Sequence, residues 1–132
     1  MHWHTIEVRT QKRVEILDIT EDVAAACARS GAAEGLAVVV QEHTTAGICI
    51  NEAEPRLISD LETWLERMVP VAGSYAHNTI DDNADAHLRA ILVGHSVCVP
   101  WTGRLALGTW QRILFVELDG PRTRRVQVAV VS

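Results

Sequence analysis

The sequence predicts a single α+β domain that spans residues 1–132. Short runs of β-branched and other apolar residues recur along the chain with the length of strands. Three other segments have the apolar spacing or the end signals of helices. Strands and helices are mixed along the chain, and no linker, repeat or low-complexity segment divides it. With 132 residues, of which 48% are hydrophobic, the chain is large enough to bury a core of its own.

The N-terminal third is expected to form strands around one helix. An alternating stretch and a short apolar run predict two adjacent strands before the helix, and two β-branched runs predict two more after it. The helix begins at Thr20, has acidic residues in its first turn, and ends at Gly31. The four strands are expected over residues 5–10, 14–17, 36–40 and 48–50.

A second helix is predicted from Pro55, which suits a first helical turn, to the residues before Pro70. Glu54 is interpreted as the acidic lead-in to this helix, because negative charge is favourable at a helix N-terminus. Residues at helical spacing are expected to form its core face: Leu57, Leu61, Trp64, Leu65 and Met68.

A third helix is predicted to begin after Asp82 as the N-cap and to end at Gly94. Its inward stripe is expected to comprise Ala84, Leu88, Ile91 and Leu92. The same geometry places His87 on the inward side. It places Asp85 and Arg89 together on the outer surface as an i,i+4 pair.

The remaining strands are expected over residues 97–99, 105–107, 113–118 and 126–131. The run 113–118 has apolar residues at both alternations, which predicts burial on both faces. Glu117 lies inside this run, where an unpaired carboxylate would be costly. We therefore expect Glu117 to be neutralised, paired or at an interface, unless that face of the strand is wet.

Composition excludes several classes of protein. Twelve basic side chains against seventeen acidic ones give a net charge of −5, which argues against nucleic acid as a partner. No apolar run is long enough to cross a bilayer, so no membrane association is expected. The odd number of cysteines predicts reduced, buried thiols at Cys27, Cys49 and Cys98. Together with the lack of signal-peptide features, this predicts a cytoplasmic protein.

Six histidines are the most prominent chemical feature of so short a chain. His77 lies in a loop rich in polar residues, and His87 is expected on the inner edge of a helix, so these two are the first candidates for a metal or catalytic site. His95 is equally compatible with capping the preceding helix and with catalysis. His2 and His4 are interpreted as surface residues. A histidine with a purely structural role is the alternative for every one of them.

Two further segments allow two interpretations each. The stretch 103–112 combines glycines, Arg104, Thr109 and Gln111, which suits an anion-binding loop. Two glycine turns that join strands are the other interpretation, and composition favours it. Glu52 is interpreted with equal weight as a metal ligand or as part of the acidic lead-in to the second helix.

The chain resembles the YjbQ-like family, often labelled secondary thiamine-phosphate synthase, from about Thr5 to Val130. The resemblance is carried by an ordered set of motifs: Gln41-Glu42-His43-Thr44-Thr45-Ala46, Asn51-Glu52, Tyr75-Ala76-His77, Ala86-His87-Leu88, Gly103-Arg104-Leu105 and Gly108-Thr109-Trp110-Gln111. The full set in this order is far more specific than any one motif.

The resemblance implies a compact domain with a curved, mostly antiparallel sheet and about three helices, assembled as a homotrimer. It implies a shared site of His43, His77 and His87, which would bind a divalent metal ion, zinc or magnesium first among the candidates, and would act in catalysis with Glu52. Contacts to a small phosphorylated metabolite are expected from Thr44, Thr45, Arg104, Gly108, Thr109 and Gln111. The implied reaction joins an aminopyrimidine pyrophosphate to a thiazole phosphate with loss of pyrophosphate. The alternative is a homotrimer that binds a metal or metabolite without catalysis.

Overall fold

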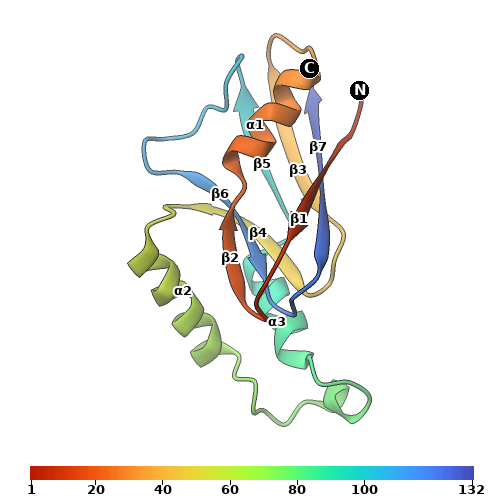
Figure 1. The fold of residues 1–132 in the computed structure, drawn as a ribbon, viewed down its shortest axis with the longest axis vertical. Helices are drawn as coiled ribbons and strands as arrows, with labels where there is room; N and C mark the ends of the chain where they lie inside the picture. The colour runs from red at the N-terminus through yellow and green to blue at the C-terminus, as the bar shows by residue number, and fades with distance from the viewer.

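The computed structural model describes residues 1–132 and contains seven strands and three α-helices (Figure 1). The strands are β1 (His4–Arg9), β2 (Glu15–Asp18), β3 (Gly35–Gln41), β4 (Ala46–Asn51), β5 (Ser96–Trp101), β6 (Arg112–Glu117) and β7 (Thr123–Val131). The helices are α1 (Thr20–Arg29), α2 (Pro55–Met68) and α3 (Ala84–Val93), with a short 3₁₀ turn, η1 (Ala76–Thr79), before α3. The predicted α+β fold is confirmed.

The strands form two antiparallel sheets. One has the order β1-β7-β3-β5 and the other the order β2-β6-β4. The prediction that the first two strands are adjacent is therefore wrong, because β1 pairs with β7 and β2 with β6. The predicted strand 105–107 is also wrong: this segment contributes only an isolated bridge between Leu105 and Trp101.

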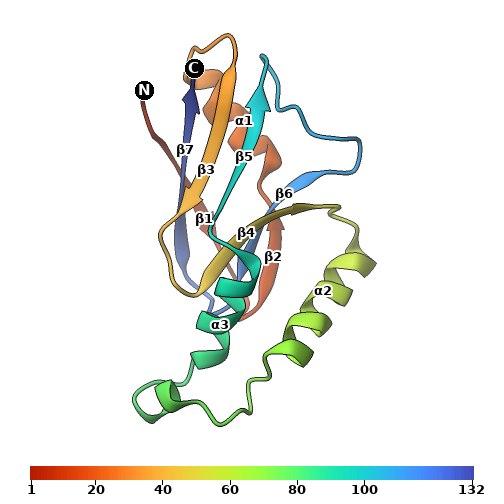
Figure 2. The same ribbon diagram turned by 180° about the vertical axis from the view of Figure 1, so that it is seen from behind.

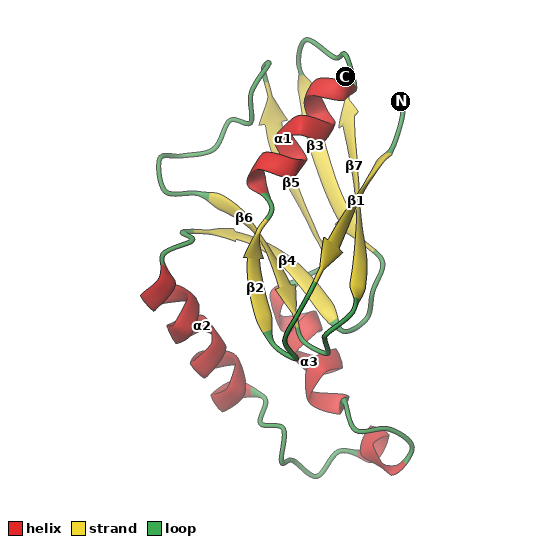
Figure 3. Ribbon diagram, viewed as in Figure 1, coloured by secondary structure: helices red, strands yellow, loops and turns green.

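The main hydrophobic core lies between the two sheets and α1. Side chains of both sheets meet there, including Ile6, Val39, Val128, Ile48 and Phe115, together with Val23 and Cys27 of α1. Figures 1 and 3 show α1 lying against the four-stranded sheet, directly after β2. Strand β6 is buried on both faces from Ile113 to Glu117, as its sequence predicts.

A second, smaller core lies on the other face of the three-stranded sheet. Helices α2 and α3 lie at this end of the domain as two separate helices (Figure 2). Leu65 of α2 and Ala86 of α3 pack there against Val116 and Leu118. Gly47 allows a close approach of β4 to the end of α3, since a Cβ on Gly47 would lie 2.6 Å from the Val93 side chain.

Helix α2 begins where the sequence predicts it, with Pro55 in the first turn and Glu54 as N-cap. The Glu54 carboxylate accepts a hydrogen bond from the Leu57 amide at 2.7 Å, which confirms its role at the helix start. The predicted core face is only partly correct. Leu65 is fully buried, whereas Trp64 is 47% and Met68 57% exposed. The helix therefore presents large apolar side chains to the outside of the chain.

Helix α3 is rotated relative to the prediction. Asp85 and Arg89, expected on the outer surface, are buried, and Ile91, expected in the core, is 79% exposed. The reason is that Asp85 pairs with Arg13, a residue near the N-terminus. The Arg13 guanidinium donates to both carboxylate oxygens of Asp85 at 3.0 and 3.1 Å. Asn83, not Asp82, is the N-cap. No helix of the chain combines the length and the apolar character that a bilayer span requires.

Candidate functional site

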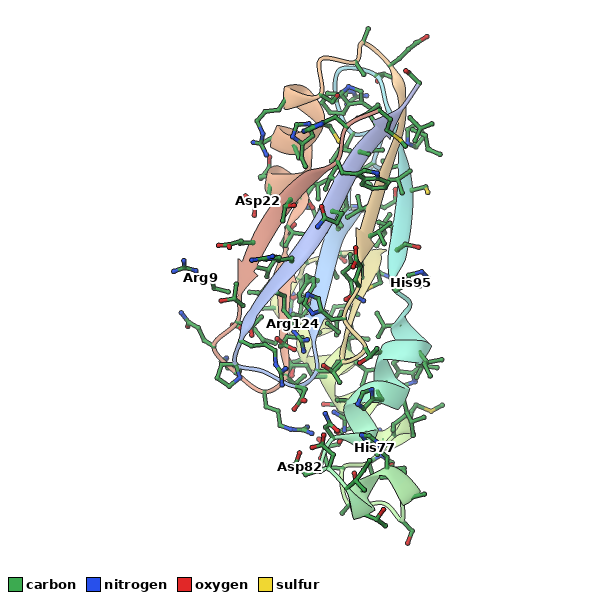
Figure 4. The ribbon with its side chains drawn as sticks, turned by 90° about the vertical axis from the view of Figure 1, so that its right-hand side faces the viewer. Arg9, Asp22, His77, Asp82, His95 and Arg124 are labelled. Atoms are coloured by element: carbon green, nitrogen blue, oxygen red, sulfur yellow. The ribbon has the colours of Figure 1, made fainter.

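His87 lies in the first half of α3 and is shared by two pockets. One pocket, of about 420 Å³, is lined also by His43, Thr44 and His95. The other, of about 470 Å³, is lined also by Tyr75 and His77. Figure 4 shows His77 beside one end of α3 and His95 at the other end, where β5 begins. The rotation of α3 leaves His87 half-buried at the edge of the helix, so its imidazole is accessible from both pockets.

The first pocket, here called the histidine pocket, has an unusual chemical composition. Its polar side chains are three imidazoles, one hydroxyl and the Gln41 amide, and its wall is completed by Ala46, Ala90, Ile91 and Gly94. No carboxylate lines it. Imidazole and hydroxyl groups donate hydrogen bonds to anions, and no carboxylate of the pocket lining opposes an anion. The composition suits an anionic or strongly hydrogen-bonding ligand.

His43 is fixed at the point where β3 ends. Gln41 is buried and holds the following turn, because its side chain donates to the Ala46 carbonyl at 2.8 Å and accepts from the His43 amide at 2.7 Å. The His43 ring then accepts the Arg125 amide N–H at its Nε2 atom, at 3.0 Å. The imidazole thus takes the position that a carbonyl of β3 would occupy if the strand continued. Burial, and then the positive charge of Arg124, lowers the pKa of His43 below its ordinary value.

Arg124 also holds the turn that carries His43, through hydrogen bonds to Thr45. Its buried guanidinium donates to the Thr45 carbonyl at 3.1 Å and to the Thr45 hydroxyl at 2.9 Å. It also forms an ion pair with Glu117, so of the alternatives left open for Glu117 the structure shows pairing. Thr45 is therefore buried beneath the turn, and of the three threonines predicted to contact a ligand only Thr44 lines the histidine pocket.

His77, on η1, stands against His87. The two ring centroids are 4.9 Å apart and the rings are nearly perpendicular. His77 Nε2 lies 3.2 Å from Oδ1 of Asn83, and Nδ2 of Asn83 donates to the Asp119 carboxylate at 2.9 Å. This chain of contacts joins η1, the start of α3 and the turn after β6. Neither Asn83 nor Asp119 was expected at the site, and the sequence signal for them is only their position in polar turns.

The geometry tests how far the three predicted histidines fit a metal ion. No three His, Cys, Asp or Glu side chains converge on one metal position. His43 turns its Nε2 lone pair to a backbone amide, so that nitrogen is engaged. His77 and His87 are the two of these three histidines whose rings lie side by side, with centroids 4.9 Å apart. His77 Nε2 also lies 3.2 Å from Oδ1 of Asn83, and metal-binding histidines commonly have such an oxygen beside their second ring nitrogen.

The other predicted contacts lie elsewhere. Thr109 and Glu52 line a separate pocket of about 300 Å³ together with Asp18, Glu54 and Arg112. Glu52 follows β4 at its end, whereas Ala46 at the beginning of that strand lines the histidine pocket, six residues and thus roughly 20 Å away along the strand.

Several polar side chains of the predicted anion-binding loop form contacts within the chain. The Gln111 side chain accepts from the Gly108 amide at 2.8 Å. Arg112 is paired with Asp18 at 2.7 Å and with Glu21 at 2.9 Å. Arg104 is exposed on the same connection. Within one chain, the structure does not bring Arg104, Gly108, Thr109 or Gln111 to the histidines.

The fold and site define a class: a small two-sheet α+β domain with a histidine-rich pocket beside one helix. Comparison with known proteins then gives the family. The profile of the family described as "UPF0047 protein YjbQ-like" matches residues 4–132, and the chain belongs to this family.

Relatives match over nearly the full length. A UPF0047 protein of Methanothermobacter thermautotrophicus is 52% identical over 96% of this chain and 90% of its own length. The protein YugU of Bacillus subtilis is 38% identical over 97% of this chain and 98% of its own. A hypothetical protein of Aeropyrum pernix has a crystal structure that covers 100% of this chain and 99% of its own, with a TM-score of 0.96 and 43% identity.

Proposed function

We propose that this protein is an enzyme that acts on a small phosphorylated metabolite, with the phosphate in the histidine pocket and the reacting group near His87. The observation that carries the proposal is that His87 lies between the carboxylate-free pocket of His43, Thr44 and His95 and the separate pocket of His77. A phosphate needs hydrogen-bond donors without competing negative charge, and a reacting group needs a titratable side chain within reach. His87 lines both pockets, so a titratable side chain lies next to the proposed phosphate site.

The reaction implied by the family resemblance is compatible with this arrangement. The ring nitrogen of a thiazole phosphate bonds to the methylene carbon of an aminopyrimidine pyrophosphate. The bond from that carbon to oxygen breaks, and its electron pair leaves with pyrophosphate. Stabilising the negative charge on the leaving oxygen is the main task of such a site. In our proposal the imidazoles of His43, His87 and His95 supply hydrogen bonds to the leaving group.

We extend the proposal to a divalent metal ion held by His77 and His87. Imidazole nitrogens favour zinc over magnesium, which prefers oxygen ligands. A bound divalent ion would neutralise phosphate charge. The remaining coordination positions would be left to water, substrate oxygen or a second copy of the chain.

Steady-state assays with the two thiamine precursors test the catalytic proposal. We expect His87→Ala and His77→Ala to lower kcat/KM by about 100-fold, as is typical for loss of an acid–base group. His2→Ala is the matched control, because it removes an exposed histidine that lines neither pocket. Equal rates for the wild type and all three variants would remove His77 and His87 from catalysis.

A non-catalytic binding protein is the alternative, and one observation favours it: the Nε2 lone pair of His43 is engaged by the backbone and is not available as a base. Calorimetry with inorganic pyrophosphate distinguishes the two functions. Binding without turnover of any tested substrate supports the alternative. Binding together with turnover supports the enzyme, and absence of binding argues against both.

We also propose that the chain assembles as a homotrimer through the outer faces of α2 and α3. Large apolar side chains gather on these helices without a covering element: Trp64, Met68, Leu88, Ile91 and Leu92. Ile91 also lines the histidine pocket, so a second copy packed on α3 would close that pocket. Sedimentation should give three times the 14.5 kDa of one chain. Ile91→Asp should shift the protein to smaller species, whereas Arg29→Ala, at an exposed position of α1, should not. A wild-type monomer would contradict the proposal.

A further inference from the structure

We infer that the chain holds His43 and His77 in opposite tautomers, so that His43 is a hydrogen-bond donor to an anion and His77 keeps a free lone pair on Nδ1. A neutral imidazole has one N–H and one lone pair, and its neighbours decide which nitrogen carries the proton. The two histidines have neighbours of opposite kind. The part of this inference that concerns an anion rests on the proposed function, whereas the tautomers themselves do not.

The neighbour of His43 is a backbone amide, which can only donate. The Arg125 N–H points at Nε2 of His43 at 3.0 Å, so Nε2 must be unprotonated. In the neutral ring the proton is then on Nδ1. The low pKa that burial and Arg124 give His43 favours this neutral form. His43 therefore has an N–H on the nitrogen that the backbone leaves free, and His43 lines the histidine pocket.

The neighbours of His77 favour the opposite tautomer, with the proton on Nε2. The Asp119 carboxylate accepts from Asn83 Nδ2 at 2.9 Å, and an ionised carboxylate can only accept. This fixes the Asn83 amide with its nitrogen toward Asp119 and its oxygen toward His77. Oδ1 of Asn83, 3.2 Å from Nε2 of His77, also only accepts, so Nε2 must carry the proton. The Nδ1 atom of His77 is left with its lone pair. Asn83 and Asp119 are thus positioning residues for His77.

The consequence is a division of roles that residue type alone does not reveal. His43 stabilises negative charge as a donor and does not act as a base or as a metal ligand through Nε2. His77 has the nitrogen that accepts a proton or binds an electrophile, beside His87 with the ring centroids 4.9 Å apart.

Nitrogen-15 NMR of the full chain, stripped of metal and held at pH 8, tests the tautomers directly. We expect His43 to show a protonated Nδ1 and an unprotonated Nε2, and His77 to show the reverse pattern. The His43 result is the more diagnostic, since free histidine favours the Nε2–H form. The same tautomer at both residues would overturn the inference, whatever the protein binds. Asn83→Leu should raise the Nδ1–H fraction of His77 and leave His43 unchanged, and an unmoved His77 spectrum would remove Asn83 from the positioning role.

Two substitutions at one position separate the structural and ligand roles of His43. In His43→Gln the side-chain oxygen reaches the position of Nε2 and still accepts the Arg125 amide, but the donor at Nδ1 is lost. In His43→Asn the side-chain amide reaches only the position of Nδ1, so a donor remains and the backbone contact is lost.

We expect opposite outcomes from this pair. His43→Gln should keep the wild-type unfolding midpoint and bind inorganic pyrophosphate about tenfold more weakly. His43→Asn should unfold at lower denaturant concentration and bind pyrophosphate more tightly than His43→Gln. Unweakened binding by His43→Gln would overturn the donor role. Failure of the wild type to bind pyrophosphate, with the two tautomers opposite, would refute the proposed function and leave the tautomer assignment standing.

Discussion

Arg124 and Glu117 form a buried ion pair that joins the two sheets of the domain. Arg124 lies on β7 of the four-stranded sheet and Glu117 ends β6 of the three-stranded sheet. Nε of Arg124 lies 2.9 and 3.1 Å from the two carboxylate oxygens, and Thr10 donates a further hydrogen bond at 2.8 Å. The same guanidinium holds the turn that carries His43. The pair therefore links the packing of the sheets to the geometry of the histidine pocket; Figure 4 labels Arg124.

Breaking this pair should destabilise the protein strongly. Glu117→Gln leaves the Arg124 guanidinium buried without a counter-charge, and we expect a loss of about 3–5 kcal/mol in the free energy of unfolding. Urea denaturation followed by circular dichroism measures the change. Replacing both residues with apolar ones of similar volume, as in Glu117→Leu with Arg124→Met, should cost less than Glu117→Gln alone, because no buried charge is left unpaired.

The exposed pair of Arg56 and Glu54 is the control for that experiment. The Arg56 side chain is 92% exposed, and exposed ion pairs contribute at most about 1 kcal/mol. Arg56→Ala should therefore leave the urea midpoint nearly unchanged. A comparable loss in Glu117→Gln and Arg56→Ala would contradict the importance given to the buried pair.

His43 should make the stability depend on pH near neutrality. Its pKa is lowered in the folded chain by burial and by Arg124, so below about pH 6.5 the unfolded chain binds a proton that the folded chain does not. The free energy of unfolding should then decrease as the pH falls from 7.5 toward 5.5. His43→Gln removes the titrating group, and its stability should vary less over the same range. Parallel profiles for the two proteins would show that His43 does not contribute.

Asp85 gives a second stability prediction, which follows from the rotation of α3. Its carboxylate is fully buried between Arg13 and Arg89, at 3.0 and 3.7 Å. Asp85→Asn removes the only counter-charge of the buried Arg89 guanidinium, and we expect a loss of about 3 kcal/mol. Asp82→Asn changes an exposed carboxylate just before the same helix and should stay within about 0.5 kcal/mol of the wild type. Thermal denaturation of the three proteins in parallel makes the comparison.

Most strands were predictable because each apolar, largely β-branched run carries its own signal, with 105–107 as the exception. The predicted limits 113–118 differ by one residue at each end from β6, and the start of α2 follows from Pro55. The orientation of α3 was not predictable by the same means. Apolar periodicity assumes that large apolar residues face the core of their own chain, and α3 buries Asp85 because Arg13 reaches it from 72 positions away. Pairing of this kind depends on the tertiary fold and leaves no local pattern.

In the candidate site too, local sequence signals identified some residues, whereas contacts made by the tertiary fold could not be predicted. Residue type and loop context were enough to single out His77 and His87, which the fold places side by side. The chemical state of His43 could not be inferred, since its partner is a backbone amide 82 positions later. Asn83 and Asp119 were missed because an amide and a carboxylate in polar turns look the same whether or not they support a histidine.

The three cysteines should differ sharply in reactivity, which corrects the expectation that all are buried. Cys27 is buried and Cys49 half-buried, and burial raises the pKa of both thiols, so neither forms thiolate readily. Cys98 is exposed on β5, an edge strand of the four-stranded sheet. In the native state one thiol per chain should react rapidly with a disulfide reagent, and Cys98→Ser should abolish that phase. If the rapid phase is absent in the native wild type and appears only on dilution, another copy of the chain covers β5, and the edge strand joins α2 and α3 in the assembly surface.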